Sequence, residues 1–248
     1  MMVYNNYQAD TSLSLQSIYN ILHLLEVICM KKLIFKLLFW IFVILLIIFS
    51  IILGLAYLKY KNAIDEISVT QKVQEIRENE NYIKLEDIST DYKNAVVSIE
   101  DHRFYTHKGI DILSIIRSTY VNFKNKSLDY GASTITQQVG RLMYFSQEKS
   151  FIRKISEIFV AFELEKNYSK DEILELYLNL MYFGNGYYGI NDASQGFFDK
   201  SPKDLSFDEA TYLAGLPNAP SIYSKDDKLA EERRLQVVNA MKKYGYID

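Results

Sequence analysis

The stretch Glu100-Asp101-His102-Arg103-Phe104-Tyr105-Thr106-His107-Lys108-Gly109-Ile110-Asp111 gathers carboxylates, cations and two imidazoles into one short segment. It follows the apolar run Ala95-Val96-Val97-Ser98-Ile99, which ends abruptly at two acids. A carboxyl group at the edge of an apolar wall is partly desolvated, which raises its pKa and suits it to general acid or base chemistry. Glu100 is therefore a candidate catalytic residue, and a solvated carboxylate at a helix end is the ordinary alternative.

Helix signals continue outward from this stretch. Asp111 is suited to cap a helix whose apolar residues recur at helical spacing, namely Ile112, Ile115, Ile116, Tyr120 and Phe123. A second stripe at the same spacing consists of Phe151, Ile155, Ile158, Phe159 and Phe162. These patterns predict two helices, each with one apolar face.

Two capping boxes predict further helix starts. Ser169 with Glu172, and Ser206 with Glu209, each precede an apolar run, and Pro217 is expected to end the second helix. Strand-like or loop pieces are expected only near 82–85 and 187–190. With three prolines in 248 residues, the sequence predicts a mainly α-helical domain.

The run Leu37–Leu58 holds 22 residues without a charge. As a helix it spans roughly 30 Å, the thickness of a bilayer core. Three lysines precede it and two follow it: Lys31, Lys32, Lys36, then Lys59 and Lys61. This bias predicts a single-pass anchor in the plasma membrane with a cytoplasmic N-terminus and an extracytoplasmic main domain.

The chain divides into four predicted segments. Residues 1–29 are interpreted as an N-terminal extension from a misassigned start, because Met30-Lys31-Lys32-Leu33 resembles a natural start for an anchor. Residues 30–58 form the basic segment and transmembrane helix. Residues 59–81 are polar and predict a stalk. Residues 82–248 lack a linker or repeat and predict one domain.

Cysteine and charge content exclude several classes. The single cysteine, Cys29, precedes the apolar run, so no disulfide holds the outer domain. The net charge is −3 and no basic run occurs, so nucleic acid is not an expected partner. His102 and His107 are five residues apart without a third ligand nearby, so hydrogen-bonded structural roles are favoured over metal binding.

A second polar cluster is Gly131-Ala132-Ser133-Thr134-Ile135-Thr136-Gln137-Gln138. Hydroxyl and amide groups of this kind bind sugar hydroxyls and phosphate oxygens without adding charge. A capped helix start, with Ser133 or Thr134 as the cap, is an alternative that is compatible with binding. Arg141 lies one turn past Gln137 on a similar face.

Two further segments complete the set. In the segment 149–157, three cations precede the acid Glu157, which suits a pyrophosphate group. Arg153 and Glu157 are also spaced as an ordinary surface pair. The loop Gly184–Ile190 is glycine-rich and permits close backbone approach, which by itself is a weak signal.

Six motifs occur in order: Glu-Asp-x-x-Phe-x-x-His-x-Gly at 100–109, Gly-Ala-Ser-Thr-Ile-Thr-Gln-Gln at 131–138, Arg-Lys-x-x-Glu-x-x-x-Ala-x-x-Leu-Glu at 153–165, Ile-Leu-Glu-Leu-Tyr-Leu-Asn at 173–179, Gly-x-Gly-x-Tyr-Gly-Ile at 184–190 and Leu-Ala-Gly-Leu-Pro-Asn-Ala-Pro at 213–220. Together they resemble the family 51 peptidoglycan glycosyltransferases, the polymerising domain of class A penicillin-binding proteins. The resemblance covers roughly residues 82–248. Because no Ser-x-x-Lys motif follows, it is closest to the monofunctional biosynthetic transglycosylases.

The resemblance implies a lysozyme-like large lobe and a small membrane-associated lobe between the first two motifs, with Leu142-Met143-Tyr144-Phe145 touching the membrane. It implies polymerisation of lipid II, with inversion at MurNAc C1 and release of undecaprenyl pyrophosphate, in a moenomycin-sensitive reaction. Glu100 would be the general base. Glu157 would assist at the donor side, directly or through Mg²⁺ or Mn²⁺, although no cofactor is obligatory.

The resemblance also implies substrate-binding residues. The cations that would offset pyrophosphate charge are Arg141, Lys149, Arg153 and Lys154. The residues that would line the cleft are Ser133, Thr134, Gln137 and Gln138. The first motif adds Asp101, Arg103, Phe104, His107 and Gly109. Implied partners are lipid II, lipid-linked glycan and the membrane, with transpeptidases and division or elongation proteins as further partners.

Four positions depart from the family pattern. Ala132 replaces a frequent second glycine, Arg141 a lysine, and Leu142 an asparagine. Ser156 replaces a common lysine, which predicts that one leaving-group cation is missing. A glycan-cutting hydrolase and a weakly catalytic membrane scaffold are the competing interpretations. The cation cluster argues against the first, and the two intact glutamates argue against the second.

Overall fold

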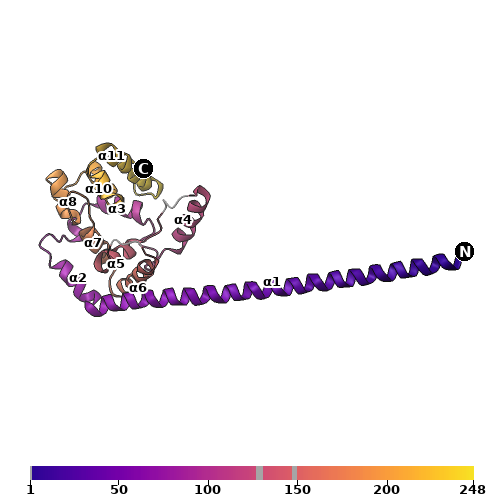
Figure 1. Ribbon diagram of the computed structural model, residues 1–248. Coiled ribbons are helices and arrows are strands. Elements are labelled where there is room, and N and C mark those ends of the chain that lie inside the picture. The colour runs from indigo at the N-terminus through magenta and orange to yellow at the C-terminus, as the bar shows by residue number, and fades with distance from the viewer. Residues whose placement is uncertain (1, 127–130, 147–149) are drawn as a thin grey trace. The chain divides into compact units, whose positions relative to one another are not determined.

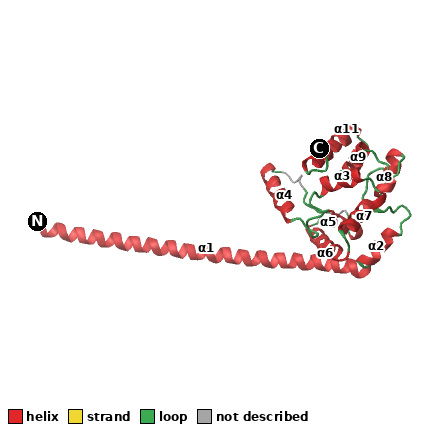
Figure 2. Cartoon of the chain, turned by 180° about the vertical axis from the view of Figure 1, so that it is seen from behind, coloured by secondary structure: helices red, strands yellow, loops and turns green. Residues whose placement is uncertain are grey.

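The computed structural model describes residues 2–126, 131–146 and 150–248. These residues form helices joined by loops, and the described ranges contain no strand (Figure 1). Figure 2 shows the same all-helical character by secondary structure. The only pairings of strand type in these ranges are isolated bridges, including Tyr182 with Tyr188. The predicted mainly α-helical fold is confirmed. Of the pieces expected to be strand-like or loop, residues 82–84 lie in a loop, and in 187–190 Tyr188 forms an isolated bridge before α8 begins.

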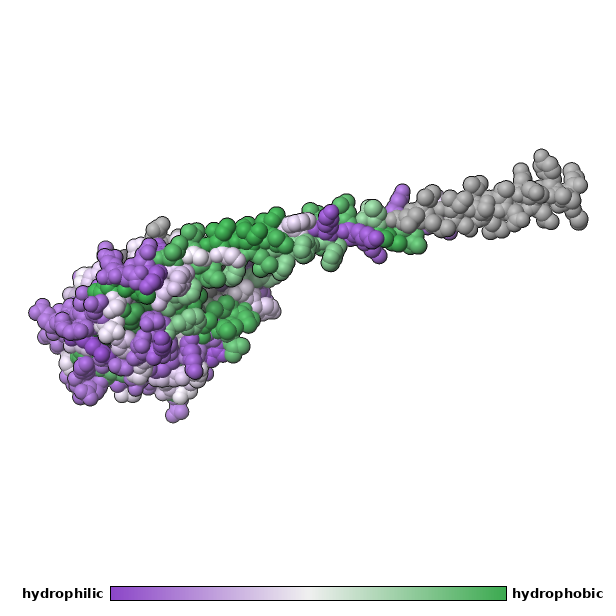
Figure 3. Space-filling view, turned by 90° about the horizontal axis from the view of Figure 1, so that it is seen from below, coloured by the Kyte–Doolittle hydropathy of each residue, from purple (hydrophilic) through white to green (hydrophobic). Residues whose placement is uncertain are grey.

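The chain forms two compact units, one up to Gly54 and one spanning Leu55–Asp248. The first helix, α1 (Met2–Glu66), supplies the first unit and the beginning of the second. It is the one helix of the described residues that is long and apolar enough to cross a membrane. Figure 3 shows apolar side chains as a green surface along this helix.

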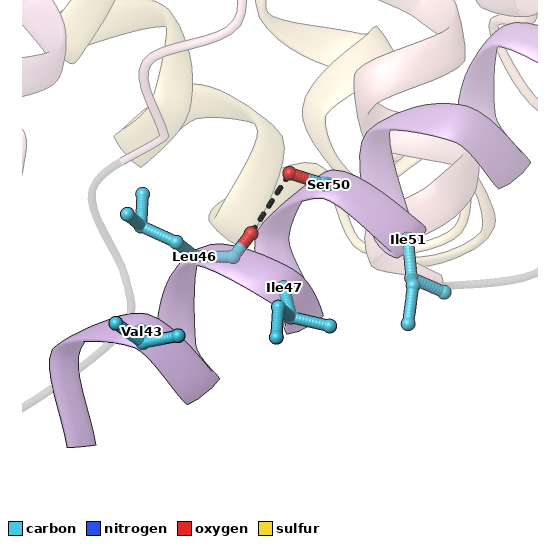
Figure 4. A pocket seen from close by; sticks show the side chains of 5 residues that line it. All are labelled: Val43, Leu46, Ile47, Ser50 and Ile51. Atoms are coloured by element: carbon cyan, nitrogen blue, oxygen red, sulfur yellow. Dashed lines mark hydrogen bonds between the residues drawn. The ribbon is translucent and has the colours of Figure 1, made fainter. Parts of the chain in front are cut away.

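A shallow hollow on α1 is lined by a single helix face (Figure 4), formed by Val43, Leu46, Ile47, Ser50 and Ile51. The Ser50 hydroxyl donates to the Leu46 carbonyl at 2.8 Å. This bond satisfies the polar group within the helix itself, as apolar surroundings require. The hollow holds no charged group and is not a candidate catalytic site.

The second unit continues with α2 (Val69–Arg77), η1 (Leu85–Asp87), α3 (Thr90–Glu100), α4 (Ile112–Asn125), α5 (Ile135–Tyr144), α6 (Phe151–Asn167), α7 (Lys170–Leu180), α8 (Gly189–Phe198), α9 (Phe207–Gly215), η2 (Leu216–Asn218), α10 (Pro220–Tyr223) and α11 (Asp227–Lys243). The predicted capping boxes begin α7 at Ser169 and α9 at Ser206. Helix α9 ends at Gly215, two residues before Pro217, as predicted.

The core of this unit surrounds α7, in which six consecutive residues from Ile173 to Leu178 are buried. A helix that is apolar on most sides is expected at the centre of a helical domain. Helix α5 packs against α6 and α7, and α3 packs against α9 and α11. The end of α3 meets the start of α5, where the Ile135 N–H donates to the Asp101 carboxylate at 3.0 Å.

Two polar residues of α7 hold the segment before α3. Glu175 accepts hydrogen bonds from the Tyr82 hydroxyl at 2.5 Å and from the Leu85 backbone N–H at 2.7 Å. The Asn179 side chain pairs with both the N–H and the carbonyl of Ile83. These bonds satisfy backbone groups that no strand partner satisfies.

The region predicted as a stalk contributes to the compact unit. Val69 and Val73 of α2 are buried in the core, and the end of α1 packs against the unit through Tyr60 and Ile64. The unit therefore begins at Leu55, within the predicted anchor. The predicted segment boundaries at residues 29, 58 and 81 stay predictions.

The predicted helix after Asp111 is present as α4, and the Ser114 N–H donates to the Asp111 carboxylate at 3.0 Å. Its apolar stripe does not face the core, because no residue of α4 is buried. The second predicted helix is present as α6 (Phe151–Asn167), and two residues of its apolar stripe, Phe151 and Phe162, are exposed. The buried face of α6 instead carries Arg153, Ser156, Glu157, Val160, Ala161 and Leu164.

The expected membrane contact at residues 142–145 stays a prediction. Met143 is buried, and its neighbours Leu142, Tyr144 and Phe145 pack against the core. The Tyr144 hydroxyl donates to the Ile67 carbonyl at 3.0 Å. These side chains therefore contribute to packing at the end of α5, and three of them keep part of their surface exposed.

Candidate active site

Glu100 is the last residue of α3 and is half-buried. Its Oε2 accepts a hydrogen bond of 2.8 Å from the side-chain amide of Gln138, in the first turns of α5. The Gln138 Oε1 in turn lies 3.2 Å from the Tyr177 hydroxyl and 3.5 Å from an Arg141 guanidinium nitrogen. The first two polar clusters of the sequence thus meet at Glu100.

Asp101 fastens the end of α3 to the start of α5. Its buried carboxylate accepts the Ile135 backbone N–H at 3.0 Å and lies 2.8 Å from His107 Nε2. A carboxylate at the N-terminus of α5 also interacts favourably with the helix dipole. The hydrogen-bonded role predicted for His107 is confirmed, and Asp101 acts by fixing the backbone beside Glu100.

Gly109 joins the same two segments. The Thr134 hydroxyl donates to the Gly109 carbonyl at 2.6 Å, and Thr134 also caps α5. Gly109 has φ of +80°, and a Cβ there would lie 3.3 Å from the Phe162 ring. Only glycine adopts this conformation without strain, so the close approach of the loop to α6 requires it.

Arg103 holds the beginning of α4. Its guanidinium binds the Asp111 carboxylate through Nε at 2.9 Å and through a second nitrogen. Burial by itself would raise the pKa of Asp111, but hydrogen bonds from Ser114 and Arg103 outweigh it and hold the pKa below its usual value. The arginine therefore stabilises the loop that follows Glu100.

His102 lies against the C-terminal end of α11. Its ring stacks on Tyr244 with centroids 4.0 Å apart, and Arg117 of α4 donates to the Tyr244 hydroxyl at 3.2 Å. Burial and the nearby Arg117 and Arg103 lower the pKa of His102. Stacking, rather than the predicted hydrogen bond, is therefore the contact that holds His102.

Glu157 is the most enclosed acid of the site, with 1% of its side chain exposed. One oxygen pairs with Arg153 and the other accepts from Lys154 Nζ at 2.9 Å. Lys154 Nζ also donates to the Ser133 hydroxyl at 2.5 Å, and 40% of its side chain is exposed. The spacing of Arg153 and Glu157 thus reflects a buried ion pair instead of a surface one.

The surroundings of Glu157 do not fit a divalent cation. Both of its carboxylate oxygens face positive side chains, which would repel Mg²⁺ or Mn²⁺. Such ions also prefer several oxygen ligands, and the described residues contain no group of three or more His, Cys, Asp or Glu suited to a metal. We therefore assign no step of the chemistry to a metal.

The remaining predicted site residues fall into a buried group and a partly exposed group. Phe104 and Gln137 lie in the interior, where Gln137 completes the capping box with Thr134 and Lys170 lies over the Phe104 ring at 4.5 Å. Ser133, Gln138, Arg141 and Lys154 are partly exposed. Gln138 and its neighbour Arg141 lie beside Glu100, and Lys154 with Ser133 lies beside Glu157. Lys149 lies outside the described residues.

Ser156 is fully buried and does not face the site. Its hydroxyl donates to the carbonyls of Ala56 in α1 and Ile152 in its own helix, at 2.9 and 2.8 Å. Phe159, one turn on, packs against Tyr57 and Tyr60 of α1 with centroids 5.6 and 5.5 Å apart. The prediction that Ser156 leaves a gap in the leaving-group cations is therefore wrong.

Replacing Ser156 by lysine is expected to destabilise the compact unit by roughly 3 kcal/mol, because an ammonium group would be buried without a counter-charge. It is not expected to accelerate any reaction at the site. Thermal unfolding of Ser156→Lys measures the effect, with Phe151→Lys on the exposed side of α6 as the matched control. An unchanged melting temperature together with a faster reaction would restore the leaving-group interpretation.

Two tyrosines near Glu100 received no role from the sequence. Tyr177 and Tyr92 are both buried, and their hydroxyls lie within electrostatic range of Glu100. The available signal was a tyrosine within the apolar run of α7, since a buried hydroxyl needs a partner. That partner, Gln138, lies 39 residues away in the sequence.

Comparison with known proteins defines the class. Residues 66–242, well over half of the chain, match the Transglycosylase family, and the chain belongs to it. This confirms the family predicted from the ordered motifs, the transglycosylase domain of class A penicillin-binding proteins.

Individual relatives agree with this assignment. The chain is 38% identical over 182 residues to penicillin-binding protein 4 of Bacillus subtilis (strain 168), covering 73% of the chain and 29% of that protein. It is 42% identical over 173 residues to penicillin-binding protein 1F of the same organism, covering 68% and 24%. It is 43% identical over 162 residues to penicillin-binding protein 1A of Neisseria gonorrhoeae, covering 64% and 20%. The chain thus spans less than a third of the length of these relatives.

Proposed function

We propose that this protein is a peptidoglycan glycosyltransferase that polymerises lipid II into β-1,4 glycan strands for the cell wall. The observation that carries the proposal is the position of Glu100, at the end of α3 and hydrogen-bonded by Gln138, in a chain of the Transglycosylase family. The other oxygen of Glu100, Oε1, accepts no hydrogen bond within the described ranges, and is free to accept a substrate proton.

In the proposed reaction, Glu100 accepts the proton of the GlcNAc 4-hydroxyl at the end of the acceptor, lipid II. The oxygen attacks C1 of the donor MurNAc as the bond from C1 to the pyrophosphate oxygen breaks. Attack from the opposite face inverts C1 from α to β, and undecaprenyl pyrophosphate leaves with the bonding electrons. A positioned base of this kind contributes about 10²–10⁴-fold to the rate.

Glu157 is proposed to act at the donor side by holding cations. Its buried carboxylate and the Ser133 hydroxyl fix Lys154, whose exposed end offers positive charge to the departing pyrophosphate. Arg141 adds a second cation near Gln138. Fixed cations that meet developing negative charge lower the barrier without reorganisation during the reaction.

The proposed location is the outer face of the plasma membrane, with α1 as the anchor and a cytoplasmic N-terminus. Helix α4 presents the exposed residues Ile112, Leu113, Ile116, Tyr120 and Phe123. An apolar surface of this kind suits a small membrane-associated lobe next to a lipid-linked substrate. Transpeptidases and division or elongation proteins are the proposed protein partners.

The test is incubation of the detergent-solubilised full chain with labelled lipid II, followed by separation of products on a gel. A ladder of glycan that disappears with moenomycin is the expected result. A folded protein that forms no ladder would reject the proposal and favour a membrane scaffold. Shortening of added glycan, without consumption of lipid II, would favour a hydrolase.

A further inference from the structure

A line of hydrogen bonds crosses three helices beneath Glu100. The Tyr177 hydroxyl of α7 donates to Gln138 Oε1 of α5 at 3.2 Å, and Gln138 Nε2 donates to Glu100 Oε2 of α3 at 2.8 Å. Helices α5 and α7 pack against each other. Within this chain of hydrogen bonds, Glu100 is bonded to the Gln138 amide and not to Tyr177 itself.

The orientation of the Gln138 amide is fixed by its neighbours. A guanidinium only donates and an ionised carboxylate only accepts, so Oε1 must face Arg141 and the NH₂ group must face Glu100. The Arg141 contact is long, at 3.5 Å, whereas the Tyr177 contact is 3.2 Å. Tyr177 therefore supplies the better-defined bond that holds the amide.

Burial makes the tyrosine contact rigid. Only 1% of Tyr177 is exposed, and its ring is part of the core around α7. Burial, with the negative charge of Glu100 as a second cause, raises the pKa of Tyr177 well above its usual value, so its hydroxyl stays protonated and available to donate. A buried hydroxyl that lost its acceptor would be left unsatisfied, which opposes rotation of the Gln138 amide.

We propose that Tyr177 is a positioning residue for Glu100, acting through Gln138. The tyrosine hydroxyl holds the amide so that its NH₂ group fixes one oxygen of Glu100 and leaves the other directed to the acceptor hydroxyl. This inference rests on the proposed function, because it takes Glu100 as the base. A site held on packed helices keeps the geometry that a loop would lose.

The experiment compares Tyr177→Phe with Tyr92→Phe in the full-length protein. Both changes remove one hydroxyl from a fully buried ring near Glu100, but the Tyr92 hydroxyl has no hydrogen-bond partner among the described residues. Tyr177→Phe is expected to lower kcat for lipid II polymerisation about tenfold, the effect of one lost hydrogen bond. Tyr92→Phe is expected to polymerise at the wild-type rate.

The pH profile separates positioning from a general structural defect. Without an oriented donor the ionised form of Glu100 is less favoured, so the acid limb of the rate profile of Tyr177→Phe is expected at higher pH than in wild type. In a Gln138→Ala background, Tyr177→Phe is expected to cause no further loss. If Tyr177→Phe melts below the assay temperature, 3-fluorotyrosine at position 177 keeps the ring and hydroxyl and must move the acid limb to lower pH.

The outcomes are distinguishable. A wild-type protein that is folded but forms no glycan defeats the proposed function, and this inference with it. An active wild type accompanied by an unchanged acid limb in Tyr177→Phe overturns the inference alone. Equal losses in Tyr177→Phe and Tyr92→Phe, or full additivity with Gln138→Ala, also overturn it.

Discussion

Replacing Glu100 by glutamine is expected to lower the rate of glycan polymerisation by about 10²–10⁴-fold, the contribution of a positioned general base. The amide keeps the size and shape of the carboxylate but accepts no proton at neutral pH. Because Glu100 is only half-buried and lies at the end of α3, the fold is expected to stay intact. The measurement is the initial rate of lipid II consumption, with the melting temperature recorded for each variant.

Glu86→Gln is the matched control, because Glu86 is an exposed acid in η1. The same chemical change there is expected to alter neither rate nor melting temperature. A folded Glu100→Gln variant that retains more than about a tenth of the wild-type rate would remove Glu100 from the role of base. The search for the base would then move to the neighbouring groups, with Glu157 first.

Replacing Glu157 by glutamine is expected to affect both stability and rate. The substitution removes the charge that Arg153 and Lys154 face in the interior of the site. Removing one partner of a buried ion pair lowers the free energy of unfolding by about 2–4 kcal/mol. Because Lys154 is partly exposed, the loss is expected toward the lower end of this range. Loss of the fixed cation is expected to lower the polymerisation rate about 10²-fold.

Denaturant unfolding and the lipid II assay, at a temperature where the variant is folded, measure these two effects. Glu163→Gln is the control, because Glu163 lies on the same helix and its side chain binds only the nearby Asn167 in the described contacts. A Glu157→Gln variant as stable as wild type would contradict the buried ion pair. A stable Glu157→Gln variant that polymerises at the normal rate would show that Arg153 and Lys154 do not need Glu157 to assist the departing pyrophosphate.

Local signals explain why much of the fold was predictable. The capping boxes at Ser169 and Ser206 begin α7 and α9, and the Asp111 cap begins α4, because each involves residues only three apart. Such contacts form within one turn and need no tertiary partner. The starts of these three helices therefore followed from the sequence alone.

The orientation of the helices was less predictable. In α6 the apolar residues Phe151 and Phe162 are exposed, whereas Glu157 is buried with its ion-pair partner Arg153. Hydropathy ranks each residue by itself and cannot anticipate that charged residues enter the interior as a pair. In α4 the apolar stripe predicts the helix correctly, but none of its residues is buried.

Two adjacent glutamines show why the sequence alone could not identify every residue of the site. Gln137 and Gln138 are equivalent in the sequence, yet the first closes the capping box of α5 and the second reaches Glu100. Gln137 is the N3 residue opposite the Thr134 cap, and Gln138, one residue on, faces the end of α3. The sequence predicted which segments meet at the site, and tertiary contacts decide which side chain of each segment reaches it.

The fastening of α4 has a consequence for its motion. The helix buries none of its own residues, and its attachments include the Asp111 cap with Arg103 and the bond from Arg117 to Tyr244. Segments with few buried contacts open at low free-energy cost. Amide hydrogens of α4 are therefore expected to exchange with solvent faster than those of α5 or α7, and to slow when liposomes cover the apolar face. The stability of α4 as a helix would then depend on contact with a lipid surface as much as on its own sequence.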